Sequence, residues 1–544
     1  LPYLLDAKFS TSLVIGTRES MKKTLSAAHY HHDSDALLSG YGIHCVTEEV
    51  DERSLQTQSM PVYYQPFVET PTPKERGMEF SPEFRDLADD PVPFLKDFLT
   101  SLEHYRDDVW KERLDTLSLD YGFLFEEAKK NSILYSLEVD RINEGIQLLE
   151  VHPKLMLAFR LMNESMSKAT IVEGKSFGSW RLFQIGFILT QIKGIYERLQ
   201  SNTCYEEADW NTADVLWFAT GGGKTEAYFG MIITALLYQR MLGQNYGTCA
   251  WIRYPLRMLT AQQFQRLSFV LAQAEKLRVF HKLGGHPFTI GYFTGSGTPN
   301  KITDSNGMYF LDSLTQERLN ALQFISVCPY CDATDRKGVK VVIEHRTARI
   351  KHVCQNENCW SNKSSPEGTY GEGTRGEIGI YVSDEECYRY LPSVMVGTLD
   401  KLAVVGMNKR CATFMGSSNH FCPNHGFIEG GKCTHYHLTS DIDATVMQCE
   451  NNSRISKIRT VPIPPMKDKG VAYFLQDELH LLKENLGNFD AHYESLWCQL
   501  QVSNGGTPPK VVAATATINA YEHHIHHLHM RHARRFPAAG PDLN

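Results

Sequence analysis

Short apolar runs of strand length alternate with longer stretches of helical periodicity through the later part of the chain. The runs are residues 213–219, 248–254, 288–293, 393–397, 470–475 and 510–514. Residues 224–241 follow the first run after a glycine-rich turn and have the length and pattern of a helix. Strands that alternate with helices form a parallel sheet covered on both faces, so the pattern predicts an α/β fold with a doubly wound sheet.

The first part of the chain has a different pattern. Residues 61–93 are rich in proline and acidic residues, which predicts a loop or linker. From residue 94 to about 165, apolar residues recur at helical spacing, as in Phe94, Phe98 and Leu102. We therefore expect an N-terminal accessory region, residues 1–165, that is largely helical after residue 94 and has a packing role.

A glycine-rich loop lies between the run at 213–219 and the helix at 224–241. Its glycines let backbone N–H groups surround a phosphate, and the following helix directs its positive end at the same anion. In a P-loop the lysine reaches the β- and γ-phosphates and the next hydroxyl binds Mg²⁺. Phe218 departs from the general P-loop pattern, which has a glycine there. The predicted ATP-binding residues are Thr220, Gly221, Gly222, Gly223, Lys224, Thr225 and Glu226.

An acidic pair follows another apolar strand, in the sequence Leu-Gln-Asp-Glu-Leu-His at residues 475–480. Nucleotides bind at the carboxyl edge of such a sheet, where Mg²⁺ must also be held. We expect Asp477 to bind Mg²⁺ and Glu478 to orient and deprotonate the attacking water. His480 would link the site to neighbouring loops. The predicted catalytic residues are Lys224, Asp477, Glu478 and His480, with ATP or ADP and Mg²⁺ as cofactors.

Two further segments resemble helicase motifs. Thr515 and Thr517, in Thr-Ala-Thr after an apolar run, resemble motif III, whose hydroxyls couple ATP to nucleic acid; the alternative is a polar strand end. Arg181 and Gln184, in Trp-Arg-Leu-Phe-Gln, resemble the adenine-reading Q motif. The amide of Gln184 could donate one hydrogen bond to adenine and accept another. The alternative for this segment is a simple helix start.

Three segments resemble helicase motifs that hold the phosphodiester chain, each after an apolar run. Any one of them could also be a plain loop or helix start, and it is their order along the chain that favours a nucleic-acid track. Contacts from N–H groups and hydroxyls to phosphates position a strand without reading its sequence. The predicted nucleic-acid residues are Pro255, Arg257, Thr294, Gly295, Thr398 and Lys401.

Cysteine spacing predicts zinc. Cys328, Cys331, Cys354 and Cys359 form two paired knuckles that suit a closed tetrahedral Zn²⁺ site of structural role. A less regular set, Cys422, His425 and Cys433 with His435 or His437, could bind a second Zn²⁺. A further group of histidines lies on a predicted helix, where a solvated or phosphate-facing surface is favoured over metal. These are His523, His524, His526, His527, His529 and His532.

The ordered motifs resemble the superfamily 2 helicases. The cysteine-rich insertion and the phrase DEECYRYLPSVMVGTLDKLA extend the resemblance to the DrmA family, the helicase subunits of bacterial DISARM anti-phage systems. This resemblance implies a RecA-like P-loop lobe, movement on single-stranded or duplex DNA driven by ATP hydrolysis, and DrmB as protein partner. The alternatives are an RNA helicase and an ATP-gated nucleic-acid sensor or scaffold that never separates strands.

Length and composition fit this picture. The 544 residues carry a net charge of −8, which argues against a protein coated in positive charge but leaves room for a local basic groove. We expect a cytoplasmic bacterial protein, since no apolar run is long enough to span a membrane and no secretory signal is evident. The family's second RecA lobe does not follow motif III here, so we expect residues 1–544 alone to bind nucleotide weakly and hydrolyse it poorly. The expected organisation is an accessory region (1–165), the RecA-like lobe (166–300, 376–407 and 461–544), a zinc-ribbon-like insertion (301–375) and a second Cys/His insertion (408–460).

Overall fold

The computed structural model describes residues 70–120, 122–199, 209–218, 222–255, 257–294, 301–303, 305–332, 334, 337–363, 376–438, 446–448, 460–516 and 521–540, with four short strands before residue 59. The chain divides into two compact units. One comprises Leu1–Pro71, Phe98–Asp140 and Ala538–Asn544, and the other comprises Thr72–Asp97 and Arg141–Pro537. The second unit holds the predicted chemistry.

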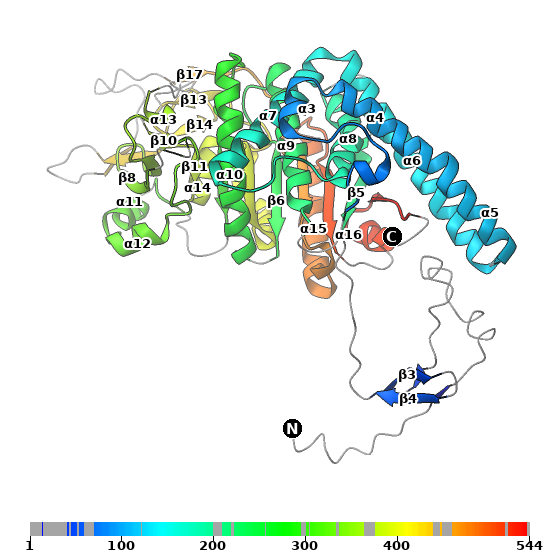
Figure 1. Ribbon diagram of the computed structural model, residues 1–544. Coiled ribbons are helices and arrows are strands. Elements are labelled where there is room, and N and C mark those ends of the chain that lie inside the picture. The colour runs from blue at the N-terminus through cyan, green and yellow to red at the C-terminus, as the bar shows by residue number, and fades with distance from the viewer. Residues whose placement is uncertain are drawn as a thin grey trace. The chain divides into compact units, whose positions relative to one another are not determined.

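The second unit is built on an eight-stranded sheet whose order is β11-β7-β12-β6-β18-β19-β5-β20 (Figure 1). Every neighbouring pair is parallel, so the α/β fold class is confirmed. All six predicted strands are present, within three residues at each end. The bounds are β5 (Thr212–Trp217), β6 (Ala250–Tyr254), β7 (Ile290–Phe293), β11 (Ile380–Tyr381), β12 (Val394–Thr398), β18 (Tyr473–Gln476), β19 (Lys510–Thr515) and β20 (His532–Phe536).

Helices cover both faces of the sheet, as neighbouring residues of β6 demonstrate. Arg253 bonds to carboxylates of α15 (Glu484–Ser503), whereas the hydroxyl of Tyr254 meets that of Tyr228 on α9 (Lys224–Met241). Successive strand residues point to opposite faces, so α15 and α9 lie on opposite sides. Because both faces are buried, the strands have continuous apolar runs.

Further helices complete the two layers. On the α9 side, α10 (Arg257–Phe280) contacts β6, β7 and β12, and α7 (Pro153–Glu173) packs on both α9 and α10. α8 (Leu182–Glu197) also packs on α9. On the α15 side lie α14 (Asp384–Tyr390), η5 (Leu399–Gly406) and α16 (Tyr521–His529), which share one apolar core with the sheet.

The accessory region is helical after residue 94, as predicted, through α4 (Val92–His104), η3 (Tyr105–Val109), α5 (Trp110–Asp120), α6 (Gly122–Val151) and α7. The prediction of a loop through residue 93 is wrong in part. α3 (Phe84–Asp89) lies there because Phe84 is buried against Trp180, with ring centroids 4.9 Å apart. The expected boundary at residue 165 falls inside α7, because this helix packs on α9 and α10 of the sheet unit.

Small antiparallel sheets are centred on the intervals predicted as insertions, although β10 and β17 lie just beyond the predicted ends at residues 375 and 460. In the first, β8 (Val339–Glu344) pairs with β9 (Arg349–Cys354), which pairs with β10 (Glu377–Ile378). In the second, β13 (His420–Cys422) pairs with β14 (Gly426–Ile428) and β17 (Val461–Pro462), and β15 (Tyr436–Leu438) pairs with β16 (Val446–Gln448). α11 (Ser305–Asp312), α12 (Gln316–Ala321) and α13 (Trp360–Lys363) also lie in the first. Both insertions meet at α14, which the main sheet positions.

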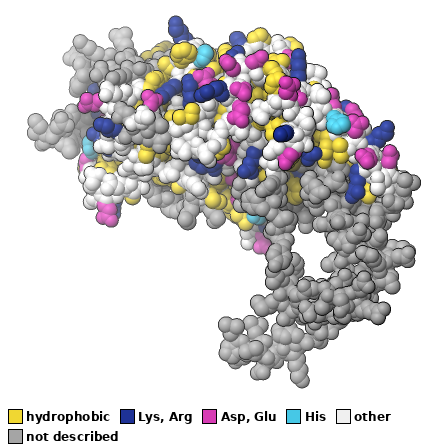
Figure 2. Space-filling view, viewed as in Figure 1, with side chains coloured by type: hydrophobic (Ala, Val, Ile, Leu, Met, Phe, Trp, Pro, Cys, Tyr) yellow, Lys and Arg dark blue, Asp and Glu magenta, His cyan; other side chains and the backbone are white. Residues whose placement is uncertain are grey.

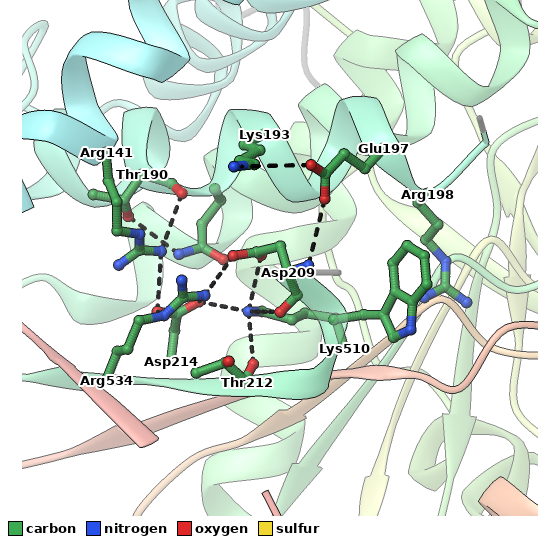
Figure 3. Close-up of polar contacts among 12 residues, drawn as sticks. Arg141, Thr190, Lys193, Glu197, Arg198, Asp209, Thr212, Asp214, Lys510 and Arg534 are labelled. Carbon is green, nitrogen blue, oxygen red and sulfur yellow. Dashed lines mark hydrogen bonds and ion pairs between the residues drawn. The ribbon is translucent and has the colours of Figure 1, made fainter. Parts of the chain in front are cut away.

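A buried ion network ties together the starts of three neighbouring strands (Figure 3). Asp214 of β5 contacts Arg141 at 3.1 Å, Lys510 of β19 at 2.7 Å and Arg534 of β20 at 3.2 Å. The carboxylate of Asp209 forms ion pairs with the same Lys510, at 2.9 Å, and with Arg534. Burial opposes ionisation of Asp214, yet the three cations hold its pKa well below the usual value. β20 was not predicted from the sequence because it is polar, and the pairing of its Arg534 with Asp209 and Asp214 explains why a polar strand lies here.

Candidate functional site

Three predicted motifs meet at one edge of the sheet. The strand order β18-β19-β5 makes neighbours of the strands that end before Asp477, at Thr515 and before the glycine-rich loop. The backbone N–H of Phe218, at the start of that loop, donates to the carbonyl of Thr515 at 3.1 Å. In parallel sheets this carboxyl edge is where ligands bind. The sheet thus joins segments almost 300 residues apart in sequence.

The loop lysine is buried and already has a local acceptor. Nζ of Lys224 donates to the carbonyl oxygen of Phe218 at 2.7 Å, and the residue is 7% exposed. Burial lowers the pKa of Lys224, while the nearby Asp477 and Glu478 oppose that shift. Gly223, with φ of 93°, caps α9 in the left-handed region that favours glycine. The predicted residues Thr220 and Gly221 lie outside the described part of the chain.

The residues predicted to read adenine contact the loop backbone. Nη1 of Arg181 donates to the carbonyl of Gly222 at 2.7 Å, and Nε2 of Gln184 donates to that of Gly223 at 2.8 Å. The other amide atom of Gln184 accepts from the backbone of Arg181 at 2.8 Å. Phe183 stacks on Phe218 with ring centroids 3.9 Å apart. This start of α8 therefore fixes the phosphate-binding loop, and the adenine role stays a prediction.

A tyrosine that sequence reasoning missed lies between the two predicted Mg²⁺ ligands. The hydroxyl of Tyr228 is 3.3 Å from Oγ1 of Thr225, 3.3 Å from Oδ2 of Asp477 and 2.9 Å from the hydroxyl of Tyr254. One turn of α9 separates Tyr228 from Thr225, so helical spacing carried a signal for it. Burial, together with the charge of Glu478, raises the pKa of Asp477 to about 6.

This pKa predicts a pH-dependent metal site. Protons compete with Mg²⁺ for the carboxylate of Asp477, so Mg²⁺ affinity should fall as pH drops below about 6. Tyr228→Phe removes a hydrogen bond that favours the carboxylate, which should move the midpoint to higher pH and weaken binding several-fold near neutrality. Mg²⁺ titration of the nucleotide-bound protein from about pH 5 to about pH 8 measures both effects. Tyr254→Phe is the matched control, and an unchanged profile in Tyr228→Phe would contradict the prediction.

The remaining catalytic candidates form a chain toward β19. Nδ1 of His480 lies 3.4 Å from Oε2 of Glu478 and 3.2 Å from Oγ1 of Thr515. Glu478 has φ of 51°, a left-handed conformation that is costly for a non-glycine residue and recurs at functional sites. His480 thus contacts the predicted coupling motif directly. The other coupling residue, Thr517, lies outside the described residues.

Glu226, predicted as a nucleotide-binding residue, is instead ion-paired with Arg266 of α10. Pairing across the α9–α10 interface gives Glu226 a structural role in this conformation. Its place in the first turn of α9 still favours the helix electrostatically, because acidic groups are stabilised there.

The predicted nucleic-acid residues lie at neighbouring strand ends but are mostly covered. Thr294 and Thr398, after β7 and at the end of β12, are 0% and 4% exposed. Lys401 is 5% exposed and pairs with Asp384 at 2.5 Å, so its ammonium would have to leave that carboxylate to reach a phosphate. Pro255 follows β6, while Gly295 and the side chain of Arg257 lie outside the described residues. On the face in Figure 2, basic and acidic side chains are interspersed.

The first cysteine cluster has the dimensions of a zinc site. Sγ of Cys328 lies 3.7 Å from that of Cys359, and Sγ of Cys331 lies 3.6 Å from that of Cys354. A tetrahedral zinc ion with Zn–S bonds of about 2.3 Å holds its sulfurs about 3.8 Å apart. Backbone N–H groups of Tyr330 and Asn356 and the hydroxyl of Ser361 donate to these sulfurs, which suits thiolates. The four residues fit the predicted Zn²⁺.

Two histidine-bearing groups behave differently. Cys422, His425 and Cys433 present ligand atoms within 4.8 Å of one another, as predicted for the second cluster. The later histidine group is helical only as far as His529, which is the last residue of α16. His532 is in β20, because that segment pairs with β5. His529 pairs with Glu494 at 2.7 Å in the core, so it faces neither solvent nor phosphate.

Comparison with known proteins gives one informative relative. The chain is 31% identical over 439 residues to the DISARM protein DrmA of Bacillus paralicheniformis, which covers 74% of this chain and 36% of that protein. The chain therefore spans about a third of the length of its curated relative. No family profile matches the chain. None of the helices in the described segments combines the length and apolarity of a membrane span.

Two solved structures are also similar, with low sequence identity and low TM-scores. A crystal structure of the DUF1998 helicase MrfA is 10% identical, with a TM-score of 0.28, over 63% of this chain and 32% of that one. The same helicase bound to DNA and AMPPNP is 9% identical, with a TM-score of 0.30, over 69% of this chain and 29% of that one.

Proposed function

The chain is a relative of the DISARM protein DrmA, and from this premise we propose that it carries the ATP-binding lobe of a superfamily 2 motor. The motor couples ATP hydrolysis to movement on DNA in bacterial anti-phage defence. The observation that carries the proposal is the cluster of Lys224, Thr225, Asp477 and Glu478 at the carboxyl edge of one parallel sheet. Thr225 and Asp477 flank a single hydroxyl, that of Tyr228, which supports a shared Mg²⁺ position.

Each residue has a part in hydrolysis. Lys224 exchanges the carbonyl of Phe218 for the β- and γ-phosphates, and the start of α9 adds its positive end. Bound Mg²⁺, held by Thr225 and Asp477, would supply charge neutralisation of the phosphates. Glu478 takes a proton from the attacking water, whose oxygen bonds to the γ-phosphorus as the bond to the bridging oxygen of ADP breaks. His480, which contacts both Glu478 and Thr515, transmits changes in the position or charge of Glu478 to Thr515.

The wider assignments are part of the same proposal. DrmB is the expected partner, and the chain's first cysteine cluster holds a structural Zn²⁺ that stabilises an insertion with little core of its own. In this proposal the lobe is interrupted by two Cys/His insertions. Because Lys401 is paired with Asp384, the DNA track requires a rearrangement at the end of β12 or residues beyond those predicted.

ATP turnover by the native protein tests the motor and its track. The rate is compared without nucleic acid and with single-stranded DNA, duplex DNA and RNA. Stimulation by DNA that is lost in Glu478→Gln is the expected result. Stimulation by RNA alone would instead favour an RNA helicase. Nucleotide binding without stimulated turnover, even with the partner added, would replace the motor with a sensor or scaffold.

A further inference from the structure

The second Cys/His cluster lies outside the machinery described for ATP. Nδ1 of His425 is 3.9 Å from Sγ of Cys422 and 3.3 Å from Sγ of Cys433. Nδ1 of His435 is 3.4 Å from the same Cys433 sulfur, and the two imidazole rings lie 5.3 Å apart between centroids. His425 therefore directs this ring nitrogen toward both cysteines, and His435 directs the same nitrogen toward Cys433.

These distances match a mixed sulfur and nitrogen site. With Zn–S bonds of about 2.3 Å and Zn–N bonds of about 2.0 Å, tetrahedral zinc places sulfur and nitrogen ligands about 3.5 Å apart. The three measured separations range from 3.3 to 3.9 Å. Two thiolates and two imidazoles form a common structural zinc set, and soft thiolates disfavour Mg²⁺ or Ca²⁺.

Phe421 and Phe427, in the strands beside the cluster, pack into the main core, but the side of the segment that carries the ligands has little apolar material. Among the described residues, Cys422, Ile428 and Cys433 form a separate core of only three buried members. Two of the three are the cysteines themselves. A metal ion would supply the stabilisation that an apolar core this small cannot.

One arginine bonds directly to the backbone of the cluster and links it to α14. Nε of Arg389, on α14, donates to the carbonyl of the ligand His425 at 2.9 Å, and Nη2 donates to that of Asn424 at 3.2 Å. Gly426 has φ of 85°, and a Cβ there would lie 2.1 Å from the Arg389 carbonyl, so only glycine permits this approach.

The same guanidinium reaches the first insertion. It donates to the carbonyls of Ala348 at 2.8 Å and Thr347 at 2.6 Å, in the turn that precedes β9 and its ligand Cys354. Arg389 is 2% exposed and is thus a buried joint between the two insertions.

We propose that Cys422, His425, Cys433 and His435 bind a second structural Zn²⁺, and that this ion locks the second insertion against Arg389 on α14. The chain then holds two zinc ions, one with four thiolates and one with two thiolates and two imidazoles. The role is structural, because four protein ligands leave no open coordination position for a substrate or water.

Metal counting by mass spectrometry on the purified native protein tests this proposal. We expect two zinc ions per chain, and one after Cys433→Ser or His435→Ala. His420→Ala, in β13 two residues before Cys422, is the matched control for His435→Ala and should retain both, as should His437→Ala. Cobalt substitution provides a readout independent of the variants, since the thiolate-to-metal absorption should correspond to six sulfurs shared by two ions.

Three results would overturn the proposal. They are one zinc ion in the unaltered protein, two ions retained by Cys433→Ser, and two ions retained by His435→Ala. Cys328→Ser should remove the other ion independently. Loss of both ions from Cys433→Ser, together with the cobalt absorption of the four-thiolate site, would also contradict the proposal, because Cys433 is a ligand of one ion only.

Discussion

Lys224→Ala should lower the rate of ATP turnover and weaken nucleotide binding together. Lys224 is the predicted phosphate-binding cation, and it is buried, where the interaction with a phosphate is little screened by water. Removing one such pre-positioned charge costs about 10²- to 10³-fold in rate. Its loss should also weaken nucleotide binding, because the lysine contacts both the β- and γ-phosphates in the ground state.

Comparison with Glu478→Gln makes this result specific. The glutamine keeps the shape of the side chain but cannot accept the proton of the attacking water, so binding should persist while turnover falls about 10²- to 10⁴-fold. Lys168→Ala removes an exposed lysine of α7 that pairs with Glu164 and should change neither quantity. ATP turnover and nucleotide titration on the three variants separate the roles. Equal loss of binding in the two site variants would contradict the assignment of Glu478 to the chemical step.

The shared edge of the ATP site was predictable because each motif is local in sequence. A phosphate-binding loop needs a strand, a glycine-rich turn and a helix in succession, and all three are legible at residues 213–241. The strand before Asp477 was equally legible. The order β18-β19-β5 was not legible, since it depends on pairing between segments that two insertions separate in sequence.

Contacts between residues far apart in sequence could not be predicted, because they depend on the tertiary structure. In the sequence, Tyr228 is one of three aromatic residues of the buried helix α9, and only the structure places its hydroxyl between Thr225 and Asp477. Lys401 looked available for phosphate because its partner Asp384 precedes it by 17 residues, beyond helical spacing. β20 was hidden because its sequence is polar: only Phe536 is buried, and Arg534 pairs with the buried Asp209 and Asp214.

The ion network at the starts of β5, β19 and β20 predicts the largest loss of stability. Asp214 is fully buried between Arg141, Lys510 and Arg534. Asp214→Asn keeps the size of the side chain but leaves the buried Lys510 and the partly buried Arg141 and Arg534 with the single carboxylate of Asp209. Breaking a buried ion pair from one side costs about 3–5 kcal/mol, so we expect a fall in Tm of at least about 5 °C.

Glu197→Gln is the matched control within the same group of side chains (Figure 3). Glu197 lies 3.9 Å from Lys193, and its side chain is 18% exposed against 0% for Asp214. Partial solvation and a long separation should limit its loss to about 1 kcal/mol or less. Thermal unfolding followed by circular dichroism measures both variants. Equal falls in Tm for Asp214→Asn and Glu197→Gln would contradict the prediction that the ion pairs of Asp214 contribute more stability than that of Glu197.

The pH dependence of the Asp214→Asn effect identifies its electrostatic origin. The pKa of Asp214 is lowered on folding by its three cations, so the folded state binds fewer protons than the unfolded state. Its stabilisation is therefore fully present above the unfolded pKa of about 3.9 and is lost as pH falls below that value. The stability gap between the unaltered protein and Asp214→Asn should be constant near neutrality and narrow in acid. A difference in stability that stayed the same in acid would contradict an electrostatic origin, because protonation of Asp214 should remove its charge as the substitution does.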